Sequence, residues 1–200
     1  MSALVACAWG SEWWRYPADE AIVVAVTTGD PLAIRVDKSH RLPADFVPTD
    51  LVEVPGEVMR VAGREVRVKR QLLEPLRKLG EAARAAGVDL AVLSGYRSFA
   101  QQGGVYAKWL KSQGGEVDAT DRFSARPGHS EHQLGTAVDF TTIEIRDGIG
   151  PQFNRTMAAR WLLGNAGRFG FRQSFPEGQE EKTGFMHEGW HWRYRGAGAE

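Results

Sequence analysis

Cysteine is nearly absent from this chain of 200 residues, which contains only Cys7. A lone cysteine cannot form a disulfide within the chain, and it cannot build a cage of thiolates around zinc. Any metal site is therefore expected to use histidine and carboxylate ligands, a donor set that suits Zn²⁺.

Charge of one sign in excess and long apolar runs are also missing. Lys plus Arg and Asp plus Glu number 25 each, so the formal net charge is zero. The basic runs are short and do not indicate a nucleic-acid surface. No apolar stretch is long enough to cross a bilayer. We therefore expect no nucleic-acid partner and no transmembrane segment.

What remains is the composition of an ordinary globular protein. Hydrophobic residues make up 42% of the chain and charged residues 25%, which argues against disorder. The length suits one domain with a sizeable core. We expect an N-terminal extension over residues 1–30, with one strand at residues 22–26, then a functional domain over residues 31–200, and a monomer.

The surroundings of Cys7 resemble the end of a bacterial lipoprotein signal. Leu4-Val5-Ala6 precede the cysteine, which such signals expose for acylation after cleavage. Six preceding residues are too few for a charged segment plus an apolar one. We expect either a chance match, the favoured interpretation, or a longer precursor that makes the protein a lipoprotein.

Helix signals occur in three places. Leucines and alanines after residue 70 follow helical spacing, Gly87 is a stop signal, and Pro75 marks the regular start or a kink. Ser98 and Gln101 have the form of a capping box. The third segment is closed by Gly170. The predicted helices cover residues 70–86, 98–110 and 157–169.

Strand signals are short and scattered. Two prolines forbid a regular helix over residues 36–52, so this segment is expected to be an extended arm. Residues 58–68 alternate around a glycine and predict a short hairpin. Further strands are predicted at residues 88–93, 136–140, 171–175 and 190–194. Helices and strands mix without a βαβ rhythm, which predicts an α+β fold.

Two histidines and one aspartate form a candidate ligand set. His132 and Asp139 flank a glycine, and some fifty residues later Glu188 precedes His191 by three positions. A catalytic zinc needs three protein ligands, an open position for water, and a carboxylate that takes the proton of the water. With His132, Asp139 and His191 as ligands and Glu188 as the base, the sequence predicts a zinc hydrolase.

The spacing imposes a condition on this site. His132 and Asp139 are seven residues apart, so in an unbroken strand they would face opposite sides of the sheet. Gly135 allows a turn between them, and Gly189 allows one between Glu188 and His191. A regular strand or helix through either pair would contradict the assignment.

A second metal motif overlaps the first. His187-Glu188-Gly189-Trp190-His191 matches H-E-x-x-H, the zincin motif, which works only on a helix. The aromatic residues that follow favour a strand instead. We therefore prefer the first ligand set over the zincin alternative.

Four blocks of the sequence resemble the VanY-type zinc D-Ala-D-Ala carboxypeptidases of bacterial cell-wall metabolism. The blocks lie in the arm, in Ser94-Gly95-Tyr96-Arg97-Ser98 with Gln101, in the S-x-H-x-x-G-x-A-x-D pattern from Ser130 to Asp139, and in E-x-W-H from Glu188 to His191. The resemblance implies a small α+β domain with an antiparallel sheet that carries the zinc site and with helices packed on it. It makes residues 31–200 a zinc peptidase domain.

The resemblance also implies roles for single residues. His132, Asp139 and His191 would be the zinc ligands, and Glu188 would be the base for the attack of zinc-bound water. Relatives often carry proline at the position of Gly189, so a looser loop is expected around Glu188 here. The implied substrate is a peptidoglycan stem peptide, from which the C-terminal D-alanine is removed.

Five further residues are candidates for binding or catalysis. Arg97 carries a fork of donors suited to an oxyanion or peptide carbonyl. Ser130 is a candidate for the substrate carboxylate, although it also suits a loop cap. Gln101 fits the pocket and the capping box almost equally. Tyr96 and Trp190 are evenly balanced between pocket wall and core.

Several activities on the same wall peptides stay open. An L,D-carboxypeptidase, a D,D-dipeptidase or a phage-type endopeptidase fits the same zinc centre. A non-catalytic zinc domain that recognises wall peptides is the minor alternative, because structural zinc usually has four protein ligands. A wall substrate implies an extracytoplasmic location, in the periplasm or cell envelope.

Overall fold

A four-stranded antiparallel sheet with the order β5-β6-β8-β7 forms the frame of the fold. The structure is a computed structural model that describes residues 22–23 and 32–196. The strands of this sheet are β5 (Ala91–Ser94), β6 (Ala137–Thr141), β7 (Phe171–Gln173) and β8 (His191–Tyr194). Helices pack on the sheet, so the predicted α+β fold is confirmed.

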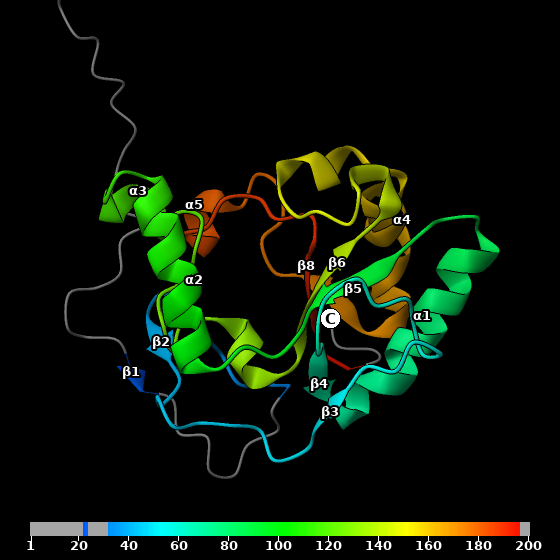
Figure 1. Cartoon of the computed structure of the whole chain (residues 1–200), viewed down its shortest axis with the longest axis horizontal. Coiled ribbons are helices and arrows are strands. Elements are labelled where there is room, and N and C mark those ends of the chain that lie inside the picture. The colour runs from blue at the N-terminus through cyan, green and yellow to red at the C-terminus, as the bar shows by residue number, and fades with distance from the viewer. Residues whose placement is uncertain (1–21, 24–31, 197–200) are drawn as a thin grey trace, which may run out of the picture.

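One face of the sheet belongs to the main hydrophobic core. Val138 and Phe140 of β6 and Trp192 of β8 point into this core, together with Phe171 of β7. Each fully buried apolar side chain of this size stabilises the fold by about 1.5–3 kcal/mol. The helices α1 (Leu73–Ala85) and α4 (Met157–Asn165) contribute the opposing apolar residues and lie on this side of the sheet in Figure 1.

The other face of the sheet carries polar groups. Side chains alternate along a strand, so Asp139 lies opposite its neighbours Val138 and Phe140, and His191 and Arg193 lie opposite Trp192. The helices α2 (Phe99–Ser112), α3 (Val117–Asp121) and α5 (Glu180–Thr183) lie on this side in Figure 1. The polar face is where the predicted site must form.

The helix signals of the sequence are confirmed. Ser98 and Gln101 form both hydrogen bonds of the capping box at the start of α2. Pro75 lies in the first turn of α1, where its missing N–H costs little. Gly87 follows α1 with a φ of +71°, and Gly170 has a φ of +82°, as expected for glycine stop signals.

The smaller elements connect this frame. Strand β1 (Ile22–Val23) pairs in parallel with β2 (His40–Arg41), and β3 (Leu51–Glu53) pairs antiparallel with β4 (Arg67–Lys69). Residues 24–26 of the predicted first strand, Cys7 and most of the N-terminal extension lie outside the described residues. Single 3₁₀ turns are η1 (Arg70–Leu72), η2 (Glu131–Leu134), η3 (Ile143–Ile145), η4 (Pro151–Arg155) and η5 (Ala166–Phe169).

The predicted hairpin at residues 58–68 is wrong. Only residues 67–69 form a strand, and they pair with β3 rather than with the preceding segment. Val61 instead bridges to Val92 of β5, and the amide of Val92 donates to Arg60 O at 2.9 Å. A Cβ on Gly63 would lie 1.9 Å from Leu93 O, so glycine is needed for this close approach. The alternating pattern therefore reports packing against β5.

The arm over residues 36–52 contains no helix, as its prolines predict. Leu42 donates its amide to Gly128 O at 2.8 Å, and Gln133 Nε2 donates to Pro43 O at 2.9 Å. The arm thus lies against the segment that carries η2. Among the helices of the described part of the chain, none combines the length and apolar character that a membrane crossing requires.

Candidate metal centre

The three predicted ligands come together on the polar face of the sheet. His132 lies in η2, and Asp139 and His191 are register partners on the adjacent strands β6 and β8. One potential ligand atom from each residue lies within 4.8 Å of the others, and all three side chains are buried. The separation of 52 residues between Asp139 and His191 is closed by the pairing of β6 with β8.

A glycine in the left-handed backbone conformation allows His132 and Asp139 to face the same point, although they are seven residues apart. Gly135 ends η2 with a φ of +69°, a conformation that other L residues rarely adopt. The chain reverses there before β6 begins, so both side chains face one point. A Cβ on Gly135 would also lie 2.8 Å from Leu51 Cδ2. The turn that the sequence required is thus present.

The hydrogen bonds of the two histidines leave their other nitrogens facing Asp139. His132 Nδ1 lies 2.6 Å from Gly95 O, and its Nε2 lies 3.2 Å from Asp139 Oδ2. His191 Nδ1 lies 2.9 Å from Asp139 Oδ1. We assign the proton of His132 to Nδ1 because a carbonyl oxygen can only accept. The lone pair of His132 Nε2 then faces the carboxylate of Asp139. A cation bound between the two groups would remove the repulsion between them.

Burial and charge act in opposite directions on these groups. Burial lowers the pKa of His132. Burial alone would raise the pKa of Asp139, but the charges and hydrogen bonds of the two histidines leave it below its ordinary value. Burial would also lower the pKa of His191, yet its hydrogen bonds with Asp139 and Glu131 raise it to about 10. The site therefore favours positive charge beside an ionised carboxylate.

This donor set fits zinc. Two imidazole nitrogens and one carboxylate oxygen match the three protein ligands of catalytic zinc sites. The set contains no thiolate, the ligand type that would favour softer metals. We therefore take the buried polar group as a candidate metal centre.

Glu188 lies beside the ligands because the chain turns before β8. The amide of His191 donates to Glu188 O at 3.2 Å, and the amide of Glu188 donates to Phe175 O at 3.0 Å. The charges of His191, Asp139 and Arg97 act on its carboxyl group, so it belongs to the same cluster. Burial raises the pKa of Glu188 to about 8, and a cation nearby would lower it.

Gly189 allows a close contact with Asn154, whereas the sequence suggested a turn and a looser loop at this position. Its amide donates to Asn154 Oδ1 at 3.0 Å, and a Cβ would lie 2.3 Å from that oxygen. Its φ is not in the left-handed region. Glycine is thus needed for the close approach of Asn154, and this hydrogen bond anchors the loop that was expected to be loose.

The zincin alternative lacks its helix. Residues 186–188 have no regular structure, and His191 begins strand β8. His187 points to other partners, since its Nδ1 lies 3.1 Å from Asn154 Nδ2 and its Nε2 lies 3.2 Å from Gln173 Nε2. The two histidines therefore do not form the helical pair that the zincin motif requires.

Arg97 approaches the candidate centre from the end of β5. Its Nη2 lies 3.7 Å from Asp139 Oδ2, and its Nη1 donates to Gln102 Oε1 at 2.7 Å. Gln102 is buried, and its Nε2 in turn donates to Ala125 O at 2.6 Å. Arg97 is therefore held by the first turn of α2 with its guanidinium near the ligands.

The remaining predicted residues divide between local structure and the site. Ser130 is the N-cap of η2, and its buried hydroxyl accepts from the amide of His132. Gln101 is exposed and its side chain completes the capping box. Trp190 packs against the main core. The guanidinium of Arg67 lies over the ring of Tyr96, with its Cζ 5.5 Å from the ring centre. Their binding roles stay predictions.

Several residues of the site were not found from the sequence. Glu131 and Arg193 are buried beside His191, Gln102 rather than Gln101 holds Arg97, and the ring of Phe175 stacks on His191 at 5.0 Å. The position of Glu131 next to a ligand was the only signal available. A single sequence does not show which strand a neighbouring side chain will face.

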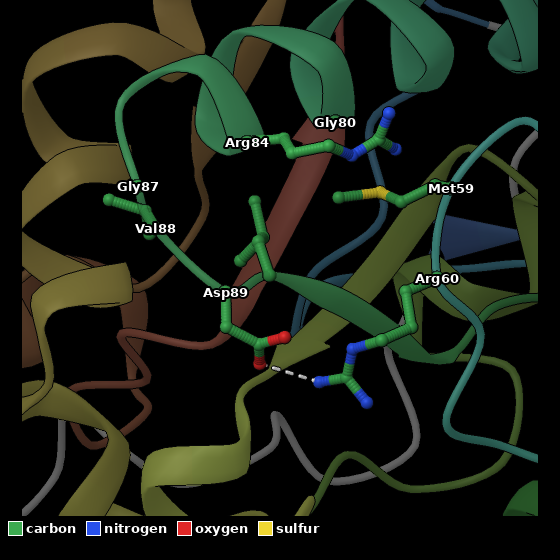
Figure 2. Close-up of a pocket in the computed structure, with 8 residues that line it drawn as sticks. Met59, Arg60, Gly80, Arg84, Gly87, Val88 and Asp89 are labelled. Carbon is green, nitrogen blue, oxygen red and sulfur yellow. Dashed lines mark hydrogen bonds and ion pairs between the residues drawn. The ribbon is translucent and has the colours of Figure 1, made fainter.

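A separate cavity lies at the end of α1. Its volume is about 290 Å³. Figure 2 shows the residues that line it, among them Met59, Arg60, Arg84 and Asp89. Arg60 is paired with Asp89 at 2.7 Å and with Asp147 at 2.8 Å. Its charge is already balanced, and the cavity includes none of the candidate ligands.

Comparison with known proteins finds a family model that covers the residues of the candidate centre. The family model described as VanY, D-alanyl-D-alanine carboxypeptidase, matches residues 65–197. YodJ of Bacillus subtilis (strain 168) is 32% identical over 162 residues, which are 80% of this chain and 59% of that protein. The D-alanyl-D-alanine carboxypeptidase of Enterococcus faecalis (strain ATCC 700802 / V583) is 34% identical over 191 residues, 90% of this chain and 65% of the relative. The chain thus spans less than two thirds of these relatives.

Solved structures show the same fold. The LD-carboxypeptidase LdcB has a TM-score of 0.72 at 29% identity, covering 82% of this chain and 76% of its own. A variant of the D,D-pentapeptidase VanY from a VanB-type vancomycin resistance cassette, solved in complex with Zn(II), has a TM-score of 0.67 at 30% identity. That comparison covers 84% of this chain and 89% of the other.

Proposed function

Because the chain belongs to the VanY family of D-alanyl-D-alanine carboxypeptidases, we propose that it is a zinc-dependent carboxypeptidase. Its proposed reaction is the removal of the C-terminal D-alanine from peptidoglycan stem peptides. The observation that carries the proposal is the convergence of His132, Asp139 and His191, with Glu188 beside them, on the polar face of the sheet. The zinc complex of the VanY relative supports the choice of metal.

His132, Asp139 and His191 would hold the ion. A zinc ion in such a set supplies Lewis acidity, which lowers the pKa of the attacking water and polarises the scissile carbonyl. Glu188 would accept the proton of the water and later pass it to the leaving amine of D-alanine. The turn from Glu188 to His191 fixes the position of this carboxyl group, which proton transfer requires.

Arg97 would stabilise the negative charge that develops on the carbonyl oxygen. Its guanidinium carries a permanent charge and lies beside Asp139. The hydrogen bond that it donates to Gln102 orients the guanidinium before substrate arrives, so little reorganisation is needed during the reaction. Ser130 is a further proposed contact for the terminal carboxylate of the substrate.

Arg97→Lys is expected to lower kcat by about 10²–10³-fold, as the loss of an oxyanion donor typically does. Lysine keeps the charge but not the fork that binds Gln102 and the substrate together. Zinc content should stay unchanged. Steady-state kinetics with metal analysis would test this, with Arg84→Lys at the separate cavity as the control. Normal kcat in the Arg97 variant would refute the role.

The direct test of the activity is a product analysis by mass spectrometry. The zinc-loaded protein is incubated with a pentapeptide that ends in D-Ala-D-Ala, and we expect release of one D-alanine. A tetrapeptide ending in a single D-alanine is the second substrate, because the LD-carboxypeptidase LdcB is among the similar structures. Release from the tetrapeptide alone would make the protein an L,D-carboxypeptidase.

A dipeptidase or an endopeptidase would give different products. Hydrolysis of free D-Ala-D-Ala indicates a dipeptidase, and cleavage within a cross-linked peptide without release of D-alanine indicates an endopeptidase. Zinc binding without cleavage of any of these substrates would contradict the enzymatic proposal. Because the substrate is part of the wall, we also propose that the protein acts outside the cytoplasm.

A further inference from the structure

A buried carboxylate beside the candidate metal centre has no part in the steps above. Glu131 is 7% exposed, and its Oε2 lies 3.1 Å from His191 Nε2. Its Oε1 accepts from Arg193 Nη1 at 2.8 Å, and the hydroxyl of Ser174 donates to Oε2. Three hydrogen-bonding groups from β8 and the segment after β7 thus converge on one carboxylate, and Arg195 Nη2 lies 3.6 Å from its Oε1.

An ionised carboxylate in this position is costly unless it is paired. Arg193 supplies the pairing charge from a fully buried position at 0% exposure. Its second nitrogen, Nη2, donates to Ile34 O at 2.6 Å, which ties the guanidinium to the segment just before the arm. The pair of Glu131 and Arg193 is therefore held from both sides. Glu131 could turn away from His191 only by losing these contacts.

The geometry of β8 explains why Glu131 meets both residues. Side chains two positions apart share a face of a strand, so His191 and Arg193 project to the same side of β8. Glu131 comes from η2, one residue before His132. The 3₁₀ turn sends Glu131 toward β8 while His132 turns toward Asp139.

The contact determines which nitrogen of His191 is available to a metal. A neutral imidazole has one N–H donor and one acceptor nitrogen. When His191 is neutral, as a metal ligand must be, its one proton resides at Nε2 beside Glu131, and the lone pair of Nδ1 is left on the side of Asp139, 2.9 Å away. His132 has the opposite arrangement, since its Nδ1 is next to Gly95 O and its Nε2 faces Asp139.

We propose that Glu131 is a positioning residue that holds His191 in the tautomer and orientation which a metal ion needs, and that Arg193 and Ser174 hold Glu131. The inference rests on the proposed zinc site. A charged acceptor also makes the imidazole a more basic ligand than a backbone carbonyl does. The two histidines are thus oriented by different partners, a carboxylate for His191 and a carbonyl for His132.

The test is Glu131→Gln, with zinc affinity measured by competition against a chelator. Glutamine keeps the shape, but its amide offers one acceptor oxygen to three donors and loses the charge. Zinc affinity is expected to fall by about 10–100-fold, the typical effect of losing an outer partner of a metal-bound histidine. In the cobalt-substituted protein, the visible absorption bands should shift, because the ligand field at His191 changes.

Two further variants separate positioning from folding. Glu81→Gln removes an exposed carboxylate of α1 and should leave zinc affinity and the cobalt spectrum unchanged. Ser174→Ala removes one donor to Glu131, so it should lower zinc affinity several-fold without unfolding the protein. If Glu131→Gln does not fold, Ser174→Ala carries the test. Thermal unfolding of the metal-free proteins identifies any loss of the fold.

The outcomes distinguish this inference from the proposed function. Wild-type protein that binds no zinc would contradict the metal centre itself. Wild-type protein that binds zinc, together with Glu131 and Ser174 variants that bind it equally well and keep the wild-type cobalt spectrum, would overturn the role of Glu131 alone. Weaker zinc binding with a shifted spectrum, in a variant whose metal-free form unfolds like wild type, supports it.

Discussion

Replacing His132 with alanine is expected to remove zinc from the protein and to abolish peptide hydrolysis. His132 is one of three converging candidate ligands, and its Nε2 lies 3.2 Å from Asp139 Oδ2. With this ligand gone, an ion would keep only Asp139 and His191, fewer than the three protein ligands of catalytic zinc sites. Protein purified without added zinc should contain about one equivalent in the wild type and less than about a tenth of that in the variant.

His187→Ala is the matched control for this experiment. It removes the first histidine of the overlapping H-E-x-x-H motif, whose ring lies beside Asn154 and Gln173 rather than beside the ligands. Zinc content should stay at the wild-type level in this variant. If His187→Ala loses the metal while His132→Ala keeps it, the ligand assignment is wrong and the zincin alternative returns.

Glu188→Gln is expected to separate metal binding from catalysis. Glu188 is no ligand in the proposed site, so zinc content should be retained, whereas kcat should fall by about 10²–10⁴-fold through the loss of proton transfer. Glutamine keeps the size of the side chain, and the backbone contacts of the turn do not depend on the carboxyl group. Metal analysis and steady-state kinetics on the same sample would measure both effects.

Glu177→Gln serves as the control, because Glu177 is an exposed carboxyl group in a nearby turn. It should match the wild type in zinc content and in kcat. A Glu188→Gln variant with full activity would refute the assignment of the base, although the metal centre could stand. A variant that loses zinc would instead make Glu188 part of the ligand set.

The candidate ligands His132 and Asp139 could be named because their signals are local. The S-x-H-x-x-G-x-A-x-D pattern contains a histidine, an aspartate and the glycine that must turn between them, and Gly135 does turn the chain with a φ of +69°. Helix caps have equally local causes, so Ser98 with Gln101 predicted the start of α2. In each case a few adjacent residues supply both the chemistry and the backbone conformation.

The hairpin prediction failed because the partner of the segment is distant in the sequence. Residues 58–68 alternate because they pack against β5, and nothing in the segment itself identifies that partner. Gln102 was missed for a different reason. It differs from Gln101 by one position on a helix, so Gln101 completes the capping box while Gln102 turns to Arg97. A turn of roughly 100° per residue decides such roles, and only the packing of α2 reveals it.

The amino-acid sequence by itself indicated the residues of the candidate centre, the carboxyl group beside them and the glycine turn that lets two of them converge. These depend on side-chain chemistry and on backbone freedom over a few residues. Only the tertiary structure decided that Glu131 and Arg193 stand behind His191, across 60 and 62 residues of chain from Glu131 to its two partners. Strand pairing and the burial of one sheet face bring such groups together, and neither can be deduced from adjacent residues.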